Sequence, residues 1–236
     1  IITNRKKTLY PGVSVCAQLV GSRELFDFAD GNQGLNMNSC QQVLNPGIIA
    51  QNRRMTAINN AVQVDLLGQA NSEYLKGKQY SGMGGIADFS SGAALCPDGK
   101  SIVVVESVTK NGKYSKIVPS FTQGTPVSLT RTMVEYVVTE YGAAVLAGKT
   151  VEERAKELIR VSHPKFRDEL TFQAKEEAGF YSPKEKPAFF NRKVFLLNKN
   201  RSAENPENRN GTAAKQQNQV ANNPKKHYTG LIYIPV

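Results

Sequence analysis

The sequence predicts an α/β protein, because short β-branched segments alternate along the chain with segments whose apolar residues have helical spacing. The chain has 236 residues, of which 40% are hydrophobic and 21% are charged. It is therefore long enough and apolar enough to bury a core without disulfides or metal ions. No stretch approaches the roughly 18 consecutive apolar residues of a membrane-spanning helix, and none is predicted.

The segments up to residue 130 predict four strands and one helix. Residues 13–21 (VSVCAQLVG) and 100–108 (KSIVVVESV) are short and β-branched, which favours buried strands. Residues 55–66 alternate apolar and polar side chains in part, and 126–130 fit a shorter strand. Residues 22–30 begin with a serine in the N-cap position, and this segment predicts a capped helix.

The segments after residue 130 are more helical. Residues 133–142 fit a helix or a strand equally well. The helix predicted over 150–162 begins with Thr150, three residues before Glu153, which is the spacing of a capping box. A further helix is predicted over 163–179, with proline near its start and glycine at its end.

Positive charge is concentrated at the carboxyl end of the chain. Residues 180–236 hold ten Lys or Arg and three acidic residues, in a chain of net charge +10. Between 198 and 227 large apolar residues are almost absent, which predicts disorder, and 228–236 fit either an edge strand or an unordered end. We therefore expect a domain over 1–179 and a basic, largely disordered extension over 180–236. Because no aromatic residue interleaves with the charges between 198 and 227, nucleic acid is not an expected partner.

The three cysteines, Cys16, Cys40 and Cys96, are widely spaced and odd in number. No pair has the spacing of a zinc knuckle or of a redox motif. The sequence therefore predicts reduced thiols, a cytoplasmic location and no metal site.

The stretch YSGMGGIADF, residues 80–89, places Gly82, Gly84 and Gly85 within four positions. It matches neither the dinucleotide-binding fingerprint nor the P-loop. A tight turn explains the glycines, and so does a loop whose main-chain N–H groups face an anion or a developing oxyanion. The residues alone leave both interpretations open.

Four longer motifs occur in order: AINNAVQVDLLGQANSE, SGMGGIADF, KNGKYSKIVP and YVVTEYGAAVLAGKTVEERAKELIRVSHPKFRDEL. Together they resemble the C-terminal domain of the acetyl-CoA hydrolase/transferase family, and most of all its 4-hydroxybutyrate and butyryl-CoA:acetate CoA-transferases. The resemblance covers about residues 1–179. It implies a central, mostly parallel sheet with flanking helices, which is the second half of a two-domain fold.

The resemblance also implies an activity. Enzymes of this family move coenzyme A between a short-chain acyl-CoA and a carboxylate such as acetate, through a glutamyl-CoA intermediate. The glutamate of the family lies just before the stretch with which this sequence starts, and residues 1–236 contain no equivalent. We therefore expect the chain to be inactive by itself and to need the N-terminal half of the enzyme as a partner. A homo-oligomer is a further possible assembly, and no membrane partner is expected.

The resemblance assigns several site residues. Gly85 is expected to donate the N–H that binds the oxyanion, and Gly84 to let the ligand approach closely. Glu140 in VVTEYG corresponds to the glutamate of the family's Thr-Glu-x-Gly and is expected at the catalytic centre. Gly82 and Met83 complete the loop that we expect to contact coenzyme A.

Other positions are less regular. Lys110 in TKNGK corresponds to the lysine of the family's Ala-Lys-Gly turn and is expected to bind coenzyme A and to pair with Glu140. Relatives commonly have Asn-x-Pro where this chain has LNP. Either Asn45 takes that place after a one-residue shift, or the polar contact is absent. Asp88 is expected to bond main-chain N–H groups of the glycine turn, and His163 to have a structural role at a helix start.

Two other functions fit the sequence. The first is an acyl-CoA hydrolase of the same family, in which water resolves the glutamyl intermediate. The second is a non-catalytic protein that binds an acidic partner through the basic extension.

Overall fold

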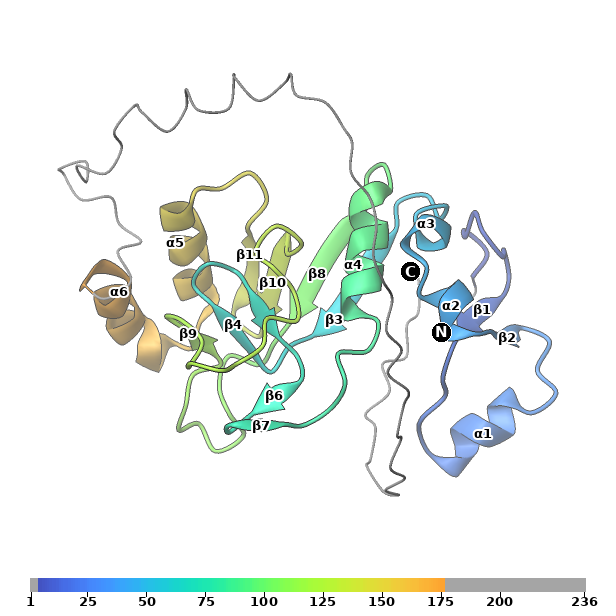
Figure 1. Ribbon diagram of the computed structural model, residues 1–236, viewed down its shortest axis with the longest axis horizontal. Coiled ribbons are helices and arrows are strands. Elements are labelled where there is room, and N and C mark those ends of the chain that lie inside the picture. Colours follow the sequence, from blue (N-terminus) through green and yellow to red (C-terminus); the bar gives the residue numbers. More distant parts are fainter. Residues whose placement is uncertain (1–3, 177–236) are drawn as a thin grey trace, which may run out of the picture. The chain divides into compact units, whose positions relative to one another are not determined.

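The computed structural model describes residues 4–176, and the elements given below lie within them (Figure 1). The extension predicted over 180–236, including its last nine residues, lies outside the described residues. Among residues 4–176, no helix is both long enough and apolar enough to cross a bilayer.

A four-stranded sheet forms the centre, in the order β11-β10-β8-β3. Strands β3, β8 and β10 are parallel to one another, and β11 returns antiparallel to β10 through a tight turn. Its strands are β3 (Thr56–Asn60), β8 (Lys100–Val104), β10 (Tyr136–Thr139) and β11 (Gly142–Val145). The α/β class and the mostly parallel central sheet are therefore confirmed.

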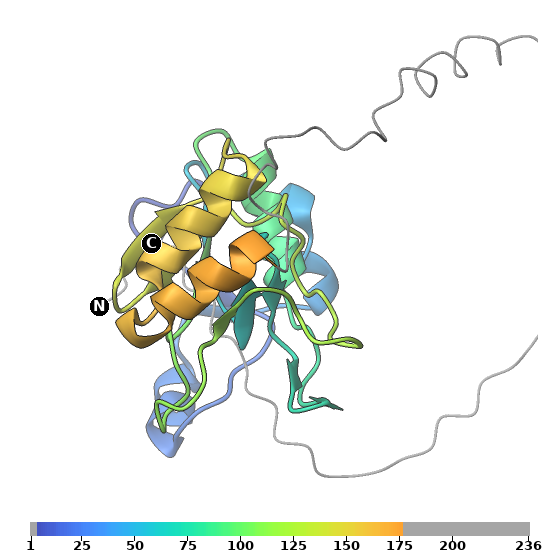
Figure 2. The ribbon, with the colours of Figure 1, turned by 90° about the vertical axis from the view of Figure 1, so that its left-hand side faces the viewer.

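Two long helices cover one face of this sheet. Helix α4 (Ile86–Leu95) packs on β3 and β8, and α5 (Val151–Val161) packs on β10 and β11. After the short 3₁₀ helix η1 (Pro164–Phe166), helix α6 (Arg167–Glu176) packs beside α5 (Figure 2). The covered face carries the buried side chains Ala57, Asn59, Ser101, Val103, Val137 and Ala144.

The opposite face of the sheet is apolar and open. Ile58 and Val145 on it are 45% and 39% exposed. Their partly buried neighbours on the same face are Ile102, Val104, Tyr136 and Val138. Parallel sheets usually have both faces covered, so this face has the composition of a buried surface without a described partner.

Smaller elements surround the central sheet. A three-stranded sheet consists of β4 (Gln63–Asp65), β5 (Ala70–Asn71) and β9 (Ile117–Val118), and β6 (Tyr74–Leu75) pairs with β7 (Lys78–Gln79). Towards the amino end, β1 (Ser14–Cys16) pairs in parallel with β2 (Leu35–Met37), and helix α1 (Arg23–Ala29) connects them. Two short helices come after β2, namely α2 (Cys40–Val43) and α3 (Pro46–Ile49).

Several predicted elements need correction. The strand expected over 126–130 does not form, because only Leu129 makes an isolated bridge, to Ala70. The segment 55–66 is two strands in two different sheets, and 133–142 contains β10 and the turn into β11. The N-cap serine of α1 makes no side-chain cap bond. Helix α4 was not predicted at all.

Candidate active site

The carboxyl ends of β3, β8 and β10 meet at one edge of the sheet, where ligands of open α/β sheets usually bind. Helix α4 ends at Leu95 and β8 begins at Lys100, so the short connection makes α4 run antiparallel to β8. The start of α4 therefore lies at the carboxyl edge (Figure 1). Glu140 follows the last residue of β10 at the same edge.

The glycine turn opens directly into α4. Gly84 has a φ of +64°, a left-handed conformation that favours glycine. Gly85 is the N-cap residue of α4, with φ −91° and ψ 14°, and no side chain caps the helix. Within residues 4–176, the main-chain N–H groups of residues 84–88 donate to no acceptor. Five consecutive donors at a positive helix end form a ready anion site.

Gly85 is tightly packed on its other side. A Cβ built on it would lie 2.6 Å from Leu44 Cδ2 and 3.1 Å from two ring atoms of Phe89. Leu44 is thus the side chain that lies against the turn. The side chain of Asn45 caps α3 instead, where its Oδ1 accepts from the N–H of Gly47 at 2.9 Å and from that of Ile48 at 3.4 Å.

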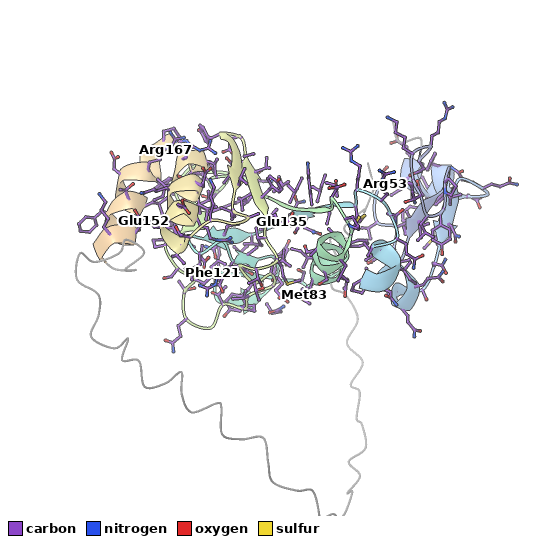
Figure 3. The ribbon with its side chains drawn as sticks, turned by 90° about the horizontal axis from the view of Figure 1, so that it is seen from above. Arg53, Met83, Phe121, Glu135, Glu152 and Arg167 are labelled. Carbon is purple, nitrogen blue, oxygen red and sulfur yellow. The ribbon has the colours of Figure 1, made fainter. Side chains whose placement is uncertain are left out.

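The preceding residues of the loop are open. A Cβ built on Gly82 would meet no atom within 4 Å. Met83 is 39% exposed and lies near the start of α4 in Figure 3. The structure therefore leaves this side of the turn uncovered.

Glu140 is held by one buried serine at the end of β8. The Ser107 hydroxyl donates to Oε1 at 2.5 Å, and the Ser107 N–H donates to Oε2 at 3.0 Å. Partial burial raises the pKa of Glu140, whereas hydrogen bonds from the Ser107 hydroxyl, from the main chain of Glu140 itself and from the Ser107 N–H lower it, as does the nearby His163. The net pKa lies below the usual glutamate value. Glu140 is exposed at its outer side and is an ionised acceptor at neutral pH.

The expected pair of Lys110 and Glu140 does not form. Both residues are exposed, and among residues 4–176 Lys110 takes part in no ion pair. Lys116 makes the neighbouring salt bridge instead, to Glu106 at 2.6 Å. An exposed Lys110 side chain keeps its solvation, so nothing forces it to pair with a carboxylate that Ser107 already satisfies.

The expectation for Asp88 was also wrong, because among the described residues its carboxylate makes no hydrogen bond with the glycine turn. It lies in the first turn of α4, where a negative charge is favourable. Asn71 orders the loop that leads to the glycine turn: its Oδ1 accepts from the N–H of Glu73 and of Tyr74. His163 has the expected structural role, since its Nδ1 accepts from the N–H of Lys165 at the start of η1.

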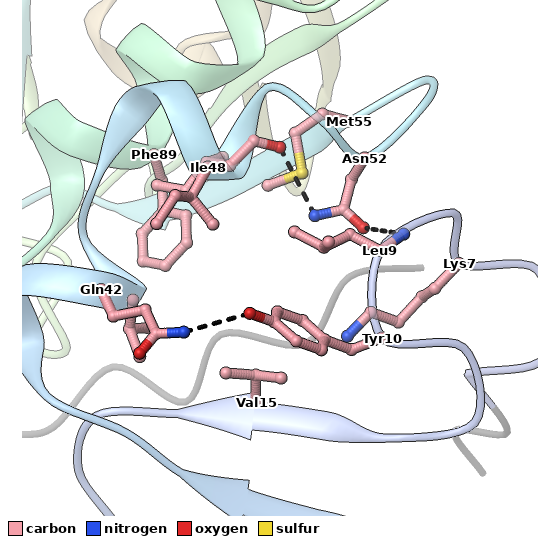
Figure 4. A pocket seen from close by; sticks show the side chains of 11 residues that line it. Lys7, Leu9, Tyr10, Val15, Gln42, Ile48, Asn52, Met55 and Phe89 are labelled. Atoms are coloured by element: carbon pink, nitrogen blue, oxygen red, sulfur yellow. Dashed lines mark hydrogen bonds between the residues drawn. The ribbon is translucent and has the colours of Figure 1, made fainter.

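A small apolar pocket lies on the far side of Phe89 (Figure 4). Its volume is about 40 Å³, well below the roughly 300–1,000 Å³ of ligand sites. Its polar groups bond one another, as where Gln42 Nε2 donates to the Tyr10 hydroxyl at 3.1 Å. We therefore do not assign it to a substrate.

A larger hollow of about 510 Å³ lies at the opposite, amino edge of the sheet, at the start of α5. Two of its three cations are engaged: Arg154 donates to the main-chain oxygens of Leu67, Leu146 and Arg131, and Lys149 pairs with a glutamate of α5. The third, Arg131, is exposed and makes no ion pair among residues 4–176. We favour the carboxyl edge because the consecutive free main-chain donors lie there. Among the described residues, no group of three or more His, Cys, Asp or Glu could hold a metal ion.

The profile of the acetyl-CoA hydrolase/transferase C-terminal domain matches residues 21–174. The chain belongs to this family. The 4-hydroxybutyrate coenzyme A transferase of Clostridium kluyveri is 46% identical over 176 residues, which are 75% of this chain and 41% of that enzyme. The predicted resemblance is therefore confirmed.

Solved structures agree with this assignment. The crystal structure of RipA from Yersinia pestis is 39% identical, with a TM-score of 0.69 over 74% of this chain and 39% of that one. The 4-hydroxybutyrate CoA-transferase of Porphyromonas gingivalis is 36% identical, with a TM-score of 0.62 over 74% and 40%. The chain thus spans about two fifths of the length of these relatives.

Two residues of the site were missed in the sequence. Ser107 lies three residues after β8 and gave no signal, because its partner Glu140 is 33 positions away. Leu44 was noticed only as the neighbour of Asn45, and its place against Gly85 follows from the packing of α3 on α4.

Proposed function

We propose that this chain is the C-terminal domain of a CoA-transferase that moves coenzyme A between a short-chain acyl-CoA and a carboxylate such as acetate. The observation that carries the proposal is the run of free N–H groups at residues 84–88, at the carboxyl edge of the sheet in a domain of this family. A fixed set of donors at a helix start suits an oxyanion, because it needs no rearrangement when the charge develops.

The proposed reaction proceeds through a glutamate outside this chain. Its carboxylate attacks the thioester carbonyl, and the CoA thiolate leaves, which gives an acyl-glutamyl anhydride. The thiolate then attacks the glutamyl carbonyl and releases the acyl group as a carboxylate. The acceptor carboxylate reverses these steps on the glutamyl-CoA. Each tetrahedral intermediate carries an oxyanion, which Gly85 N–H binds, while Gly84 keeps the approach free.

The remaining site residues have supporting roles in this proposal. Glu140 is the fixed acceptor that orients an N–H or O–H group of the substrate opposite the donors of the turn. Gly82 and Met83 border the open side along which coenzyme A passes, and the exposed cation of Lys110 attracts its phosphates. Asn45 stays a candidate contact only if its cap on α3 opens.

The proposed partner is the N-terminal half of the enzyme, and the open face of the central sheet supports it. Ile58 and Val145 are large, exposed and on the uncovered side of a parallel sheet. Helix α1 also has no buried residue, and its Phe26 and Phe28 are 48% and 64% exposed. Such surfaces mark protein interfaces, and the relatives contain a further three fifths of sequence to cover them.

The proposed domain covers residues 1–179, and the proposed basic extension covers 180–236. The proposed location is the cytoplasm, because the three free cysteine thiols persist in a reducing compartment.

Reconstitution tests the proposed activity. The chain is mixed with the N-terminal part of the Clostridium kluyveri relative, and butyryl-CoA is supplied with and without acetate. We expect acetyl-CoA only when both proteins and acetate are present. Release of free coenzyme A in the absence of acetate would show that the activity is that of a hydrolase and not of a transferase. Binding of nucleic acid that is lost when residues 198–236 are deleted would favour the non-catalytic basic binding protein.

The interface has its own test. Ile58→Lys with Val145→Lys places two charges on the open sheet face, and both sites are exposed in the free chain, so folding should be unaffected. We expect at least a tenfold loss of association with the N-terminal part in sedimentation. The matched control is Leu95→Lys, at a side chain 65% exposed at the end of α4, and it should bind normally. Equal binding by all three proteins contradicts the assignment of this face.

A further inference from the structure

Glu140 lies in the tight turn between β10 and β11, and hydrogen bonds of Thr139 hold the main chain of this turn against α5. Thr139 and Gly142 pair across the β10–β11 hairpin, which leaves Glu140 and Tyr141 as its two turn residues. The Thr139 hydroxyl accepts from the Tyr141 N–H at 3.0 Å and donates to the carbonyl of Val161, at the end of α5, at 2.6 Å. The turn is thereby anchored to a helix rather than left as a loose loop.

The carboxylate of Glu140 is fixed from the other side, by Ser107. Ser107 is 0% exposed. Its hydroxyl donates to Oε1 of the carboxylate, and its N–H donates to Oε2 at 3.0 Å and more weakly to Oε1 at 3.3 Å. Two donors on one rigid residue leave the carboxylate a single orientation, and charged acceptors make such bonds stronger than neutral ones.

Strand-end stability alone does not explain this arrangement. The ends of β8 and β10 are already joined by their ladder, and Thr139 already ties the turn to α5. An exposed carboxylate adds little to stability. What the two bonds from Ser107 supply is a charge held in one place.

We propose that Ser107 is a positioning residue, which holds the Glu140 carboxylate in a single orientation at the edge of the sheet where the free N–H groups of the glycine turn lie. The catalytic part of this inference rests on the proposed CoA transfer. The geometric part rests only on the hydrogen bonds. A fixed acceptor and fixed donors at the same edge give a substrate two reference points before it arrives.

Other charged groups near Glu140 also influence its pKa, and the experiment has to keep them constant. Glu106 follows β8 and disfavours a second negative charge nearby, while Lys110 and Lys116 offset Glu106. His163, at the start of η1, favours the charged form of Glu140. These groups are unchanged in a Ser107 variant, so a change in the titration of Glu140 reports the lost hydroxyl.

The experiment is an NMR titration of the purified chain with carbon-13 glutamate. In Ser107→Ala we expect the pKa of Glu140 to rise, because the hydroxyl no longer stabilises the carboxylate. The matched control is Ser101→Ala, a buried serine within β8, whose hydroxyl donates to Ser90 at 3.1 Å. It should lose comparable stability and leave the titration of Glu140 unchanged. Ser107→Thr keeps the hydroxyl and should restore the wild-type titration.

Stability gives a second readout with a definite sign. A carboxyl group whose folded pKa is depressed stabilises the fold above its unfolded pKa and loses that contribution as the pH falls. The unfolding free energies of wild type and Ser107→Ala should therefore converge on acidification, whereas the difference for Ser101→Ala should persist. An unchanged Glu140 titration in Ser107→Ala overturns the proposal.

Catalysis is measured separately in the reconstituted enzyme. There Ser107→Ala should lower kcat at least tenfold with little change in KM, and its acid limb should move to higher pH. If the wild-type mixture transfers no coenzyme A, the proposed function fails, and the titration of Glu140 still decides the role of Ser107.

Discussion

Helices α4 and α5 cover the same face of the sheet but begin in opposite ways. At the start of α5, Thr150 and Glu153 form a full capping box: the Thr150 Oγ1 accepts from the Glu153 N–H at 3.3 Å, and the Glu153 carboxylate accepts from the Thr150 N–H at 2.8 Å. At the start of α4, Gly85 has no side chain and the donors stay free.

The difference shows where the fold gives up stability. A glycine N-cap costs only about a few tenths of a kcal/mol relative to Ser, Thr, Asn or Asp, so the open start of α4 is slightly less stable than a capped one. It lies at the carboxyl edge of the sheet, whereas the capped start of α5 lies at the amino edge. We interpret α5 as a structural helix and the start of α4 as a helix end kept open for a ligand.

The largest expected effect is that of Gly85→Ala in the reconstituted enzyme. The new methyl group meets Leu44 and Phe89 and displaces the donors, although alanine keeps its own N–H. We expect kcat to fall about 100-fold, the range for loss of one oxyanion donor, with a smaller change in the affinity for coenzyme A. Steady-state kinetics with butyryl-CoA and acetate measure both quantities.

Two variants control for this result. Leu44→Ala combined with Gly85→Ala removes the closest contact, at 2.6 Å, and should recover part of the activity. Gly82→Ala adds a methyl group in the open space that we propose for coenzyme A, so it should change the KM for coenzyme A substrates and leave kcat nearly unchanged. An unchanged kcat in Gly85→Ala would contradict the assignment of the Gly85 N–H as the oxyanion donor.

Thr150→Ala should affect stability and not the ligand. Loss of the capping box should lower the unfolding free energy by about 1 kcal/mol, which shifts Tm by about 2–4 °C in a domain of this size. Because the bonds from Thr150 lower the pKa of Glu153, the difference from wild type should narrow as the pH falls below the ordinary value of 4.5. Calorimetry at two pH values tests this, and weaker binding of coenzyme A by the variant would contradict a purely structural role.

Gly84→Ala should cause a small loss of stability and a small loss of affinity for coenzyme A. An alanine at a φ of +64° is strained, by about 1 kcal/mol, and the turn should relax away from its open form. We expect a slightly lower Tm together with weaker binding of coenzyme A. A Tm equal to that of the wild type would show that the turn adopts another conformation in solution.

The smallest effect is a shift of amide signals. Titration of the chain with acetate should move the N–H resonances of Gly84, Gly85 and Ile86, whereas those of the Thr150–Glu153 cap should stay in place, because that helix start is already satisfied. Equal shifts at both helix starts would remove the distinction between them.

Local chemistry made some elements predictable. The capping box of α5 needs only Thr150 and Glu153 at the right spacing, and β8 is β-branched enough to be recognised. Helix α4 was missed because its sequence, IADFSSGAAL, has serines and a glycine in the middle, which are poor helix formers. The glycine is there for packing: a Cβ on Gly92 would lie 2.4 Å from Ile49 Cγ2, so α3 approaches α4 only without a side chain at this position.

The sequence by itself determined the class of fold, the glycine turn and the family, because these depend on residue types and on spacing along the chain. Only the tertiary structure decided that Leu44 rather than Asn45 lies against Gly85, that Ser107 rather than Lys110 bonds Glu140, and that one face of the sheet is open. Each of these depends on which residues distant in sequence become neighbours. Spacing within a segment fixes helices and caps, but such neighbours are set by how strands pair and helices pack, and no local pattern records that.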